Sequence, residues 1–202
     1  MIIKEILECK TDLELYNDFL NGNQEAFNII VSRYRRVLIS FILKYVQQLD
    51  VAEDLAQDTF IYVLMNRKEY NFKFSLKAYL FMIAKYRALN YIKKQKRIFT
   101  YDDEYALKLK DTMNLEEEIL KKEGNKEIYF AIRKLKKEYQ MAIYLKDLQN
   151  FKYKEICNIL GKTMPQTKIL IHRARKALAK ILEKGWLNVR GKKIYWRDME
   201  QI

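Results

Sequence analysis

The sequence predicts an all-α protein in which two helical domains are joined by an acidic linker. Half of its 202 residues are apolar, and only five glycines and one proline are present. Strand-and-turn architectures need more turn-forming residues than that, so helices are the default. Apolar residues recur at helical spacing in two blocks, and the segment between them is locally acidic and lacks that period. We therefore expect domains over 12–97 and 126–184, a linker over 98–125 and a tail of unknown role over 185–202.

Three long helices are predicted in the first domain, and each has a recognisable start. A turn at 21–23 precedes a long apolar stripe over 27–45 and can cap its helix. Asp50 can cap the second helix, and Ser75 can cap the third. The helical period is lost over 66–75, so these residues are expected to form a loop.

The second domain is expected to end in a helix-turn-helix. Gly161 follows the last apolar residue of one helix, where a left-handed residue closes a helix. Thr163 then caps the next helix, and Pro165 falls in its first turn, where a missing N–H costs nothing. The helices of this domain are expected to begin near Lys126, Lys137 and Tyr153 and after Thr163, with Ile169, Ile171, Ala174 and Leu178 on the inner face of the last.

This pattern predicts binding to duplex DNA. A three-residue turn fixes two helices at a steep angle, so the second can enter a major groove. Its first side chains then reach base edges, and its later basic residues meet phosphates. A helical hairpin that serves only packing is the alternative. His172 has no carboxylate, Ser or Cys partner nearby, so we do not expect it to be catalytic.

The overall charge agrees with a polyanionic partner. The formal net charge is +13, which suits nucleic acid or an anionic membrane. No apolar run approaches the ~18 residues that span a bilayer, and the acidic N-terminus does not resemble a signal peptide. We therefore expect a cytoplasmic protein without membrane insertion. One histidine and two cysteines offer few metal ligands, and no nucleophile–base pair is visible, so no metal, cofactor or enzyme activity is expected.

The predicted second helix carries an acidic stripe. Glu53, Asp54, Gln57 and Asp58 are spaced by one and four, which places them on one face. Asp54 and Asp58 repel each other by about a few tenths of a kcal/mol in isolation, so a basic partner would explain them. An acidic bias that complements the helix dipole is the alternative, and it explains Asp58 poorly.

The predicted third helix interleaves aromatic with basic side chains. Aromatic rings stack on unpaired bases at roughly 1–3 kcal/mol each, and basic groups track the backbone. Such a helix suits single-stranded nucleic acid, although core packing is the alternative for any one ring. The rings are Tyr79, Phe81, Tyr86 and Tyr91, and the basic residues are Lys77, Lys85, Arg87, Lys93, Lys94, Lys96 and Arg97.

The helix-turn-helix resembles the promoter-reading region 4 of bacterial sigma-70 factors of the extracytoplasmic-function (ECF) group. Gly161, Lys168 and the His-Arg-Ala-Arg run at 172–175 match the pattern of that region. Gln166 and the pair at 169–170 depart from it, so the promoter sequence read here is expected to differ from that of better-known members.

The first domain resembles region 2 of the same family. The acidic stripe resembles region 2.2, with Asp58 in place of the usual Glu, and the third helix resembles the −10 reading regions 2.3–2.4, with a partial match at 83–86. Together the two resemblances cover about residues 13–97 and 127–182. Two family regions in the right order are far more specific than either alone.

The resemblance implies an alternative RNA polymerase sigma factor. Such a protein binds core polymerase through the β′ clamp helices and β flap, reads promoter DNA at −10 and −35, and in many cases is held by an anti-sigma factor. The alternative is a stand-alone helix-turn-helix regulator that does not engage core polymerase, a function for which the acidic stripe and the aromatic-basic helix are not needed.

The residues that the resemblance implies fall into three sets. The polymerase-binding set is Glu53, Asp54, Gln57 and Asp58. The −10 set is Tyr70, Asn71, Phe72, Tyr86, Arg87, Asn90, Lys93, Lys94 and Arg97. The −35 set is Thr163, Gln166, Thr167, Lys168, Leu170, His172, Arg173 and Arg175.

Overall fold

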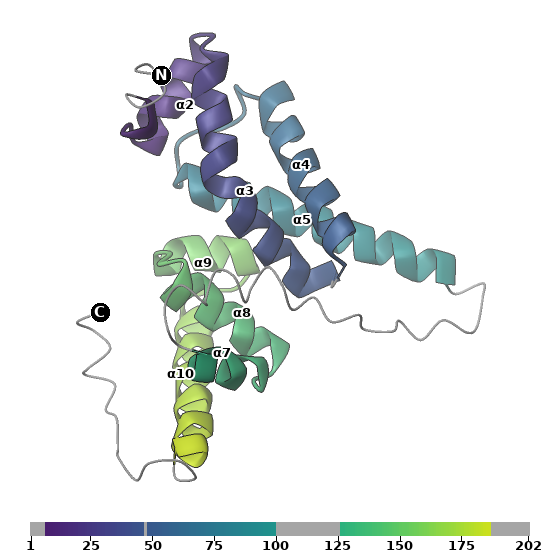
Figure 1. Cartoon of the computed structure of the whole chain (residues 1–202), viewed down its shortest axis with the longest axis vertical. Coiled ribbons are helices and arrows are strands. Elements are labelled where there is room, and N and C mark those ends of the chain that lie inside the picture. The colour runs from purple at the N-terminus through teal and green to yellow at the C-terminus, as the bar shows by residue number, and fades with distance from the viewer. Residues whose placement is uncertain (1–6, 47, 100–125, 187–202) are drawn as a thin grey trace. The chain divides into compact units, whose positions relative to one another are not determined.

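A computed structural model describes residues 7–46, 48–99 and 126–186 of the chain (Figure 1). Every regular element in these ranges is a helix, which confirms the predicted fold class. The predicted acidic linker, except for its first two residues, and nearly all of the tail lie outside the described residues. The chain divides into two compact units, and we describe each by itself.

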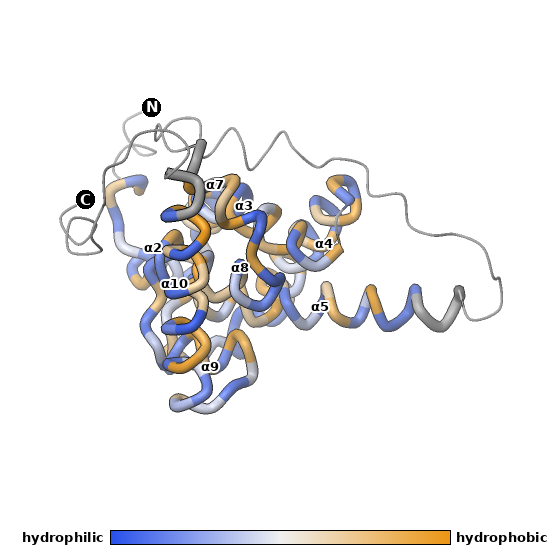
Figure 2. The backbone as a smooth tube through the Cα atoms, turned by 90° about the horizontal axis from the view of Figure 1, so that it is seen from below, coloured by the Kyte–Doolittle hydropathy of each residue, from blue (hydrophilic) through white to orange (hydrophobic). Residues whose placement is uncertain are grey.

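The N-terminal unit consists of α2 (Asp12–Leu20), α3 (Gln24–Val46), α4 (Leu49–Met65) and α5 (Leu76–Phe99). Helix α3 packs against each of the other three, and α4 also packs against α5. The C-terminal part of α5 extends beyond α3 and α4 (Figure 1), and hydrophobic and hydrophilic residues alternate along it (Figure 2). The largest fully buried side chains of this unit are Tyr16, Phe19, Phe41, Phe81, Leu15, Ile30, Leu38, Ile42 and Leu80.

Two of the three predicted caps in this unit are confirmed. The Asn23 side chain accepts a hydrogen bond from the Ala26 N–H at 3.3 Å, and Ser75 Oγ accepts one from the Ala78 N–H at 3.2 Å. The prediction for Asp50 is wrong. Helix α4 begins at Leu49, so Asp50 lies inside its first turn, where its charge complements the helix dipole instead.

The C-terminal unit contains α7 (Lys126–Arg133), α8 (Lys137–Ile143), α9 (Tyr153–Leu160) and α10 (Met164–Trp186), and α10 packs against α7 and α8. All four starts agree with the sequence prediction. The sequence did not predict the π-helical turn Tyr144–Leu148 that continues α8. Gly161 has a φ of +69°, which confirms the left-handed turn between α9 and α10.

One phase error in α10 needs correction. Ile169 was predicted on the inner face, but it is 51% exposed, whereas Leu170 is buried. Ile171, Ala174 and Leu178 are buried as predicted. A residue two positions before Ile171 is turned by about 200° around the helix, so Ile169 lies on the opposite side from the core.

Candidate functional site

The acidic stripe lies on the outer face of α4. Asp54, Gln57 and Asp58 are exposed, and Glu53 is partly exposed. Glu53 lies at the edge of the stripe, where its carboxylate is 3.9 Å from the guanidinium of Arg35 on α3. The structure therefore brings the four predicted side chains together on one accessible side, while Ala52, Ala56, Thr59, Phe60 and Val63 are buried.

Three apolar side chains extend the stripe toward the C-terminal end of α4. Ile61, Leu64 and Met65 are 43%, 46% and 78% exposed. Ile61 and Met65 follow Asp54 and Asp58 by seven residues, about two helical turns, and therefore lie on the same face. Sequence reasoning missed them, although this spacing was the available signal. An apolar patch beside a charged one is typical of a protein–protein interface. We call this acidic and apolar surface, residues 53, 54, 57, 58, 61, 64 and 65, the α4 face.

Arg87 of α5 is held by two side chains of α4. Its Nη1 lies 3.5 Å from the carboxylate of Asp58, and its guanidinium carbon lies 5.5 Å from the ring centroid of Tyr62. Its Nε is buried without a hydrogen-bond partner among the described residues. Tyr62 in turn donates a hydrogen bond to Glu69 at 2.6 Å, and this bond, with burial and the carboxylate charge, raises the pKa of Tyr62 to about 12. These contacts connect the acidic stripe to the helix predicted to read DNA.

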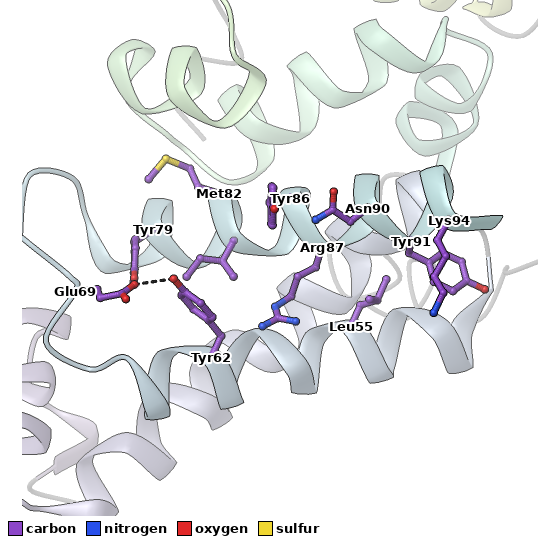
Figure 3. A pocket seen from close by; sticks show the side chains of 11 residues that line it. Leu55, Tyr62, Glu69, Tyr79, Met82, Tyr86, Arg87, Asn90, Tyr91 and Lys94 are labelled. Carbon is purple, nitrogen blue, oxygen red and sulfur yellow. Dashed lines mark hydrogen bonds between the residues drawn. The ribbon is translucent and has the colours of Figure 1, made fainter. Parts of the chain in front are cut away.

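A groove of about 660 Å³ runs between α4 and α5 (Figure 3). Four tyrosine rings and three apolar side chains form most of its lining, and two cations, an amide and one carboxylate complete it. Aromatic rings beside cations suit a single nucleic-acid strand, because its unpaired bases have flat apolar faces and its backbone is negatively charged. The lining residues are Leu55, Tyr62, Glu69, Tyr79, Met82, Ile83, Tyr86, Arg87, Asn90, Tyr91 and Lys94.

The predicted −10 residues of α5 differ in accessibility. Tyr86 is 67% exposed, and Asn90, Lys93 and Lys94 are also exposed. Arg87 is partly exposed and engaged by α4, as described above. Arg97 is the last predicted −10 residue of α5, and its side chain lies outside the described part of the chain.

The loop 66–75 presents Phe72 and buries Tyr70. Phe72 is 43% exposed, and its φ of +57° is unusual for a residue with a large side chain. Asn71 is exposed as well. Tyr70 is only 7% exposed and stacks on Tyr79 with 5.0 Å between centroids. In the free chain the Tyr70 ring therefore belongs to the core beneath the loop, and its contact with a base stays a prediction.

The exposed face of α10 carries most of the predicted −35 residues. Gln166, Lys168, His172 and Arg173 are all exposed. Thr163 Oγ1 accepts a hydrogen bond from the Gln166 N–H at 3.4 Å, and the Gln166 side chain accepts one from the Thr163 N–H at 2.9 Å. This reciprocal cap confirms Thr163 as the helix cap and fixes Gln166 in the first turn of α10.

Two predicted −35 residues are buried. Thr167 is 0% exposed and accepts a hydrogen bond from the Cys157 thiol at 3.2 Å, and Leu170 is 7% exposed. Both side chains pack inside this unit, and their contact with DNA stays a prediction. The helical period places both on the side of Ile171, and the exposed side carries Ile169 instead.

Arg175 is engaged within the C-terminal unit. Its Nε lies 3.1 Å from Asp147 Oδ1, and its Nη2 also contacts that oxygen. Asp147 belongs to the π-helical turn after α8, so this pair ties α10 to that turn. The sequence predicted a DNA contact for Arg175 and gave no sign of this partner.

The described residues offer neither a metal centre nor a membrane span. No group of three or more His, Cys, Asp and Glu side chains among them could hold a metal ion. Within the same ranges, no helix combines the length and apolarity needed to cross a bilayer.

Comparison with known families decides between a sigma factor and a stand-alone regulator. The sigma-70 region 2 model matches residues 30–98, and the sigma-70 region 4 model matches residues 125–178. The chain belongs to the sigma-70 family. A sigma factor is a transcription initiation factor and not an enzyme, and a stand-alone regulator is not favoured because both regions are present in order.

Individual relatives place the chain in the ECF group of that family. The ECF RNA polymerase sigma-E factor of Salmonella typhimurium is 29% identical over 180 residues, which cover 85% of this chain and 94% of the relative. The sigma factor RpoE of Bartonella quintana, solved with the anti-sigma factor NepR, superposes with a TM-score of 0.58 at 22% identity over 78% of this chain and 96% of that one. CnrH, solved with the cytosolic domain of CnrY, superposes with a TM-score of 0.57 at 21% identity over 86% and 97%. These two structures share the fold of this ECF sigma factor.

Proposed function

We propose that the α4 face binds the β′ clamp helices of core RNA polymerase. The observation that carries this proposal is the continuity of the acidic residues with exposed Ile61, Leu64 and Met65. Charge complementarity steers two proteins together and sets their register, whereas buried apolar area supplies most of the binding free energy. Asp54 and Asp58 serve the first purpose and the apolar trio the second, and the neutral amide of Gln57 offers hydrogen bonds beside them.

The groove side of α5 and the loop 66–75 bind the −10 element as a separated strand. Exposed Tyr86 and Phe72 offer ring faces for stacking, and Lys93 and Lys94 lie where they can meet the strand's phosphates. Strand separation is driven by this binding free energy, because stacked rings replace the contacts between neighbouring bases. The polymerase performs the chemistry, and this chain forms no covalent bond with DNA.

Helix α10 enters the major groove of the −35 element. Gln166 and Lys168 lie in its first two turns and reach base edges, while His172 and Arg173 reach phosphates. Ile169 joins the first group, because an exposed apolar side chain in a major groove contacts the methyl group of thymine. Arg175 supports the helix through Asp147 and lies at the edge of this surface.

The remaining assignments follow from the same function. The −10 domain spans 12–97, the −35 domain spans 126–184, and 98–125 connects them. The protein acts in the cytoplasm, where core polymerase and promoters are found, and the β flap is a second polymerase contact. An anti-sigma factor is a further partner, since the sigma factor RpoE, which shares this fold, has been solved with one.

Gel filtration with core polymerase tests the proposal. We expect the chain to co-elute with core polymerase at micromolar concentration, and a charge-reversed Asp54→Lys variant to elute alone. Run-off transcription on genomic fragments then recovers the promoter. Failure of the wild-type chain to co-elute would rule out the polymerase contact.

A further inference from the structure

The loop 66–75 is held from below by a residue of α2. Tyr16 is fully buried, and its hydroxyl donates a hydrogen bond to the Arg67 carbonyl at 2.8 Å. Its ring makes edge contacts with Tyr70, at 4.9 Å between centroids, and with Phe72, at 6.0 Å. Tyr16 therefore contacts the start of the loop through its hydroxyl and the middle of the loop through its ring.

These contacts fix the most unusual backbone conformation in the loop. Phe72 has a φ of +57°, which disfavours a bulky side chain and persists only where the surroundings determine it. Tyr70 lies against the Phe72 ring at 4.6 Å, and its own hydroxyl donates to the Phe74 carbonyl at 2.5 Å. Tyr16 and Tyr70 thus support one side of Phe72, while 43% of that residue stays exposed.

We propose that Tyr16 is a positioning residue for the −10 strand, because it holds the loop so that Phe72 presents a ring face to an unpaired nucleobase. This inference rests on the proposed function of the loop. A ring that is already fixed loses little conformational freedom when a base stacks on it. More of the stacking free energy therefore contributes to the affinity for the strand. Burial raises the pKa of Tyr16, so its hydroxyl stays protonated and able to donate throughout the neutral range.

Removal of one oxygen atom isolates the effect. Tyr16→Phe keeps the buried ring and loses only the hydrogen bond to the loop. Tyr34→Phe is the matched control, because Tyr34 is also buried in this unit and its hydroxyl donates to Asp12 on α2, not to the loop. Phe72→Asn removes the exposed ring but keeps a residue that tolerates a positive φ.

The probe is a fluorescently labelled single strand carrying the −10 element of the promoter recovered by run-off transcription. Its affinity is measured for holoenzyme assembled from each full-length variant. We expect Tyr16→Phe to bind about fivefold more weakly, the size of one net hydrogen bond, and Tyr34→Phe to bind like wild type. Phe72→Asn should lower the affinity for the strand about tenfold. The double variant with Tyr16→Phe should bind no more weakly than Phe72→Asn alone, because Tyr16 acts through Phe72.

Two companion measurements separate positioning from folding. Affinity for core polymerase and for a −35 duplex should not change in Tyr16→Phe, and an equal loss in all three assays would overturn the proposal. The proposal would also be overturned if Tyr16→Phe bound the single strand as tightly as wild type. The same holds if the loss of affinity in the double variant equalled the product of the two single losses. If wild-type holoenzyme itself does not bind the strand, the proposed −10 function fails and the inference fails with it.

Discussion

Asp58 of α4 and Arg87 of α5 form an ion pair with 3.5 Å between Oδ2 and Nη1. The pair joins a residue proposed to bind polymerase to one that the sequence predicted to bind DNA. It also gives Asp58 a cation within the chain, so the repulsion between Asp54 and Asp58 does not by itself require an external partner. The Asp58 side chain is 54% exposed, and exposed pairs contribute only about 0.2–1 kcal/mol, so a polymerase cation can compete for it.

The cleanest charge test of the polymerase contact therefore uses Asp54 and not Asp58. We expect Asp54→Lys to weaken binding to core polymerase about tenfold or more, because it places a cation in a surface that steers a basic partner. The control is Glu25→Lys, which reverses an exposed acid at the start of α3. Binding is measured by fluorescence anisotropy with labelled core polymerase, and equal affinities of the two variants would contradict the assignment.

The apolar part of the α4 face gives a second prediction. Met65→Asp should weaken polymerase binding, because it places a charge in an interface that loses water on binding. The Met65 side chain is 78% exposed in the free chain, so the melting temperature should change little. Leu13→Asp on α2 is the control, since Leu13 is a 55% exposed apolar residue outside this face. A loss of affinity in both variants would point to a general effect of added charge.

A salt titration tests the role of Lys168. Because Lys168 is proposed to read a base edge, Lys168→Ala should lose about 1–3 kcal/mol on the recovered promoter and little on unrelated DNA. A uniform loss on all sequences, with the slope of log K against log salt for −35 duplex binding lowered by about one unit, would instead make it a phosphate contact. Lys137→Ala, at the start of α8, should leave the slope unchanged, and an equal change there would remove Lys168 from the interface.

Arg175 is expected to act through Asp147. Arg175→Ala and Asp147→Ala should each lower the free energy of unfolding by about 1 kcal/mol, and the double variant should lose no more than either alone. Chemical denaturation of the full chain measures all three. If Arg175 binds DNA directly, Asp147→Ala will spare −35 binding while Arg175→Ala reduces it.

Helix ends were the most predictable part of this fold, because caps are local. Asn23, Ser75 and Thr163 each bond to an N–H three residues later, so the sequence alone indicates them. The prediction for Asp50 was wrong because an acidic residue suits the first turn of a helix as well as its N-cap. The local sequence does not distinguish these two positions. The π-helical turn Tyr144–Leu148 could not be predicted, because the local spacing of apolar residues does not distinguish it from an α-helix.

Side-chain roles were harder to predict, because burial and ion pairs depend on tertiary contacts. Periodicity anchored on Ile171 would have placed Ile169 outside and Leu170 inside, so that error lay in the helical phase. Tyr70 could not have been assigned in the same way, since the rings that bury it include Tyr16, 54 residues earlier in the sequence. The pairs of Arg87 with Asp58 and of Arg175 with Asp147 likewise join segments that are distant in sequence.

Run-off transcription with purified core polymerase tests the central claim most directly. Core polymerase alone and core polymerase with the chain are compared on the same genomic fragments, and the 5′ ends of the transcripts are mapped. We expect discrete start sites only when the chain is present, and their loss with Asp54→Lys but not with Glu25→Lys. Transcript patterns that do not change when the chain is added would contradict its role as a sigma factor.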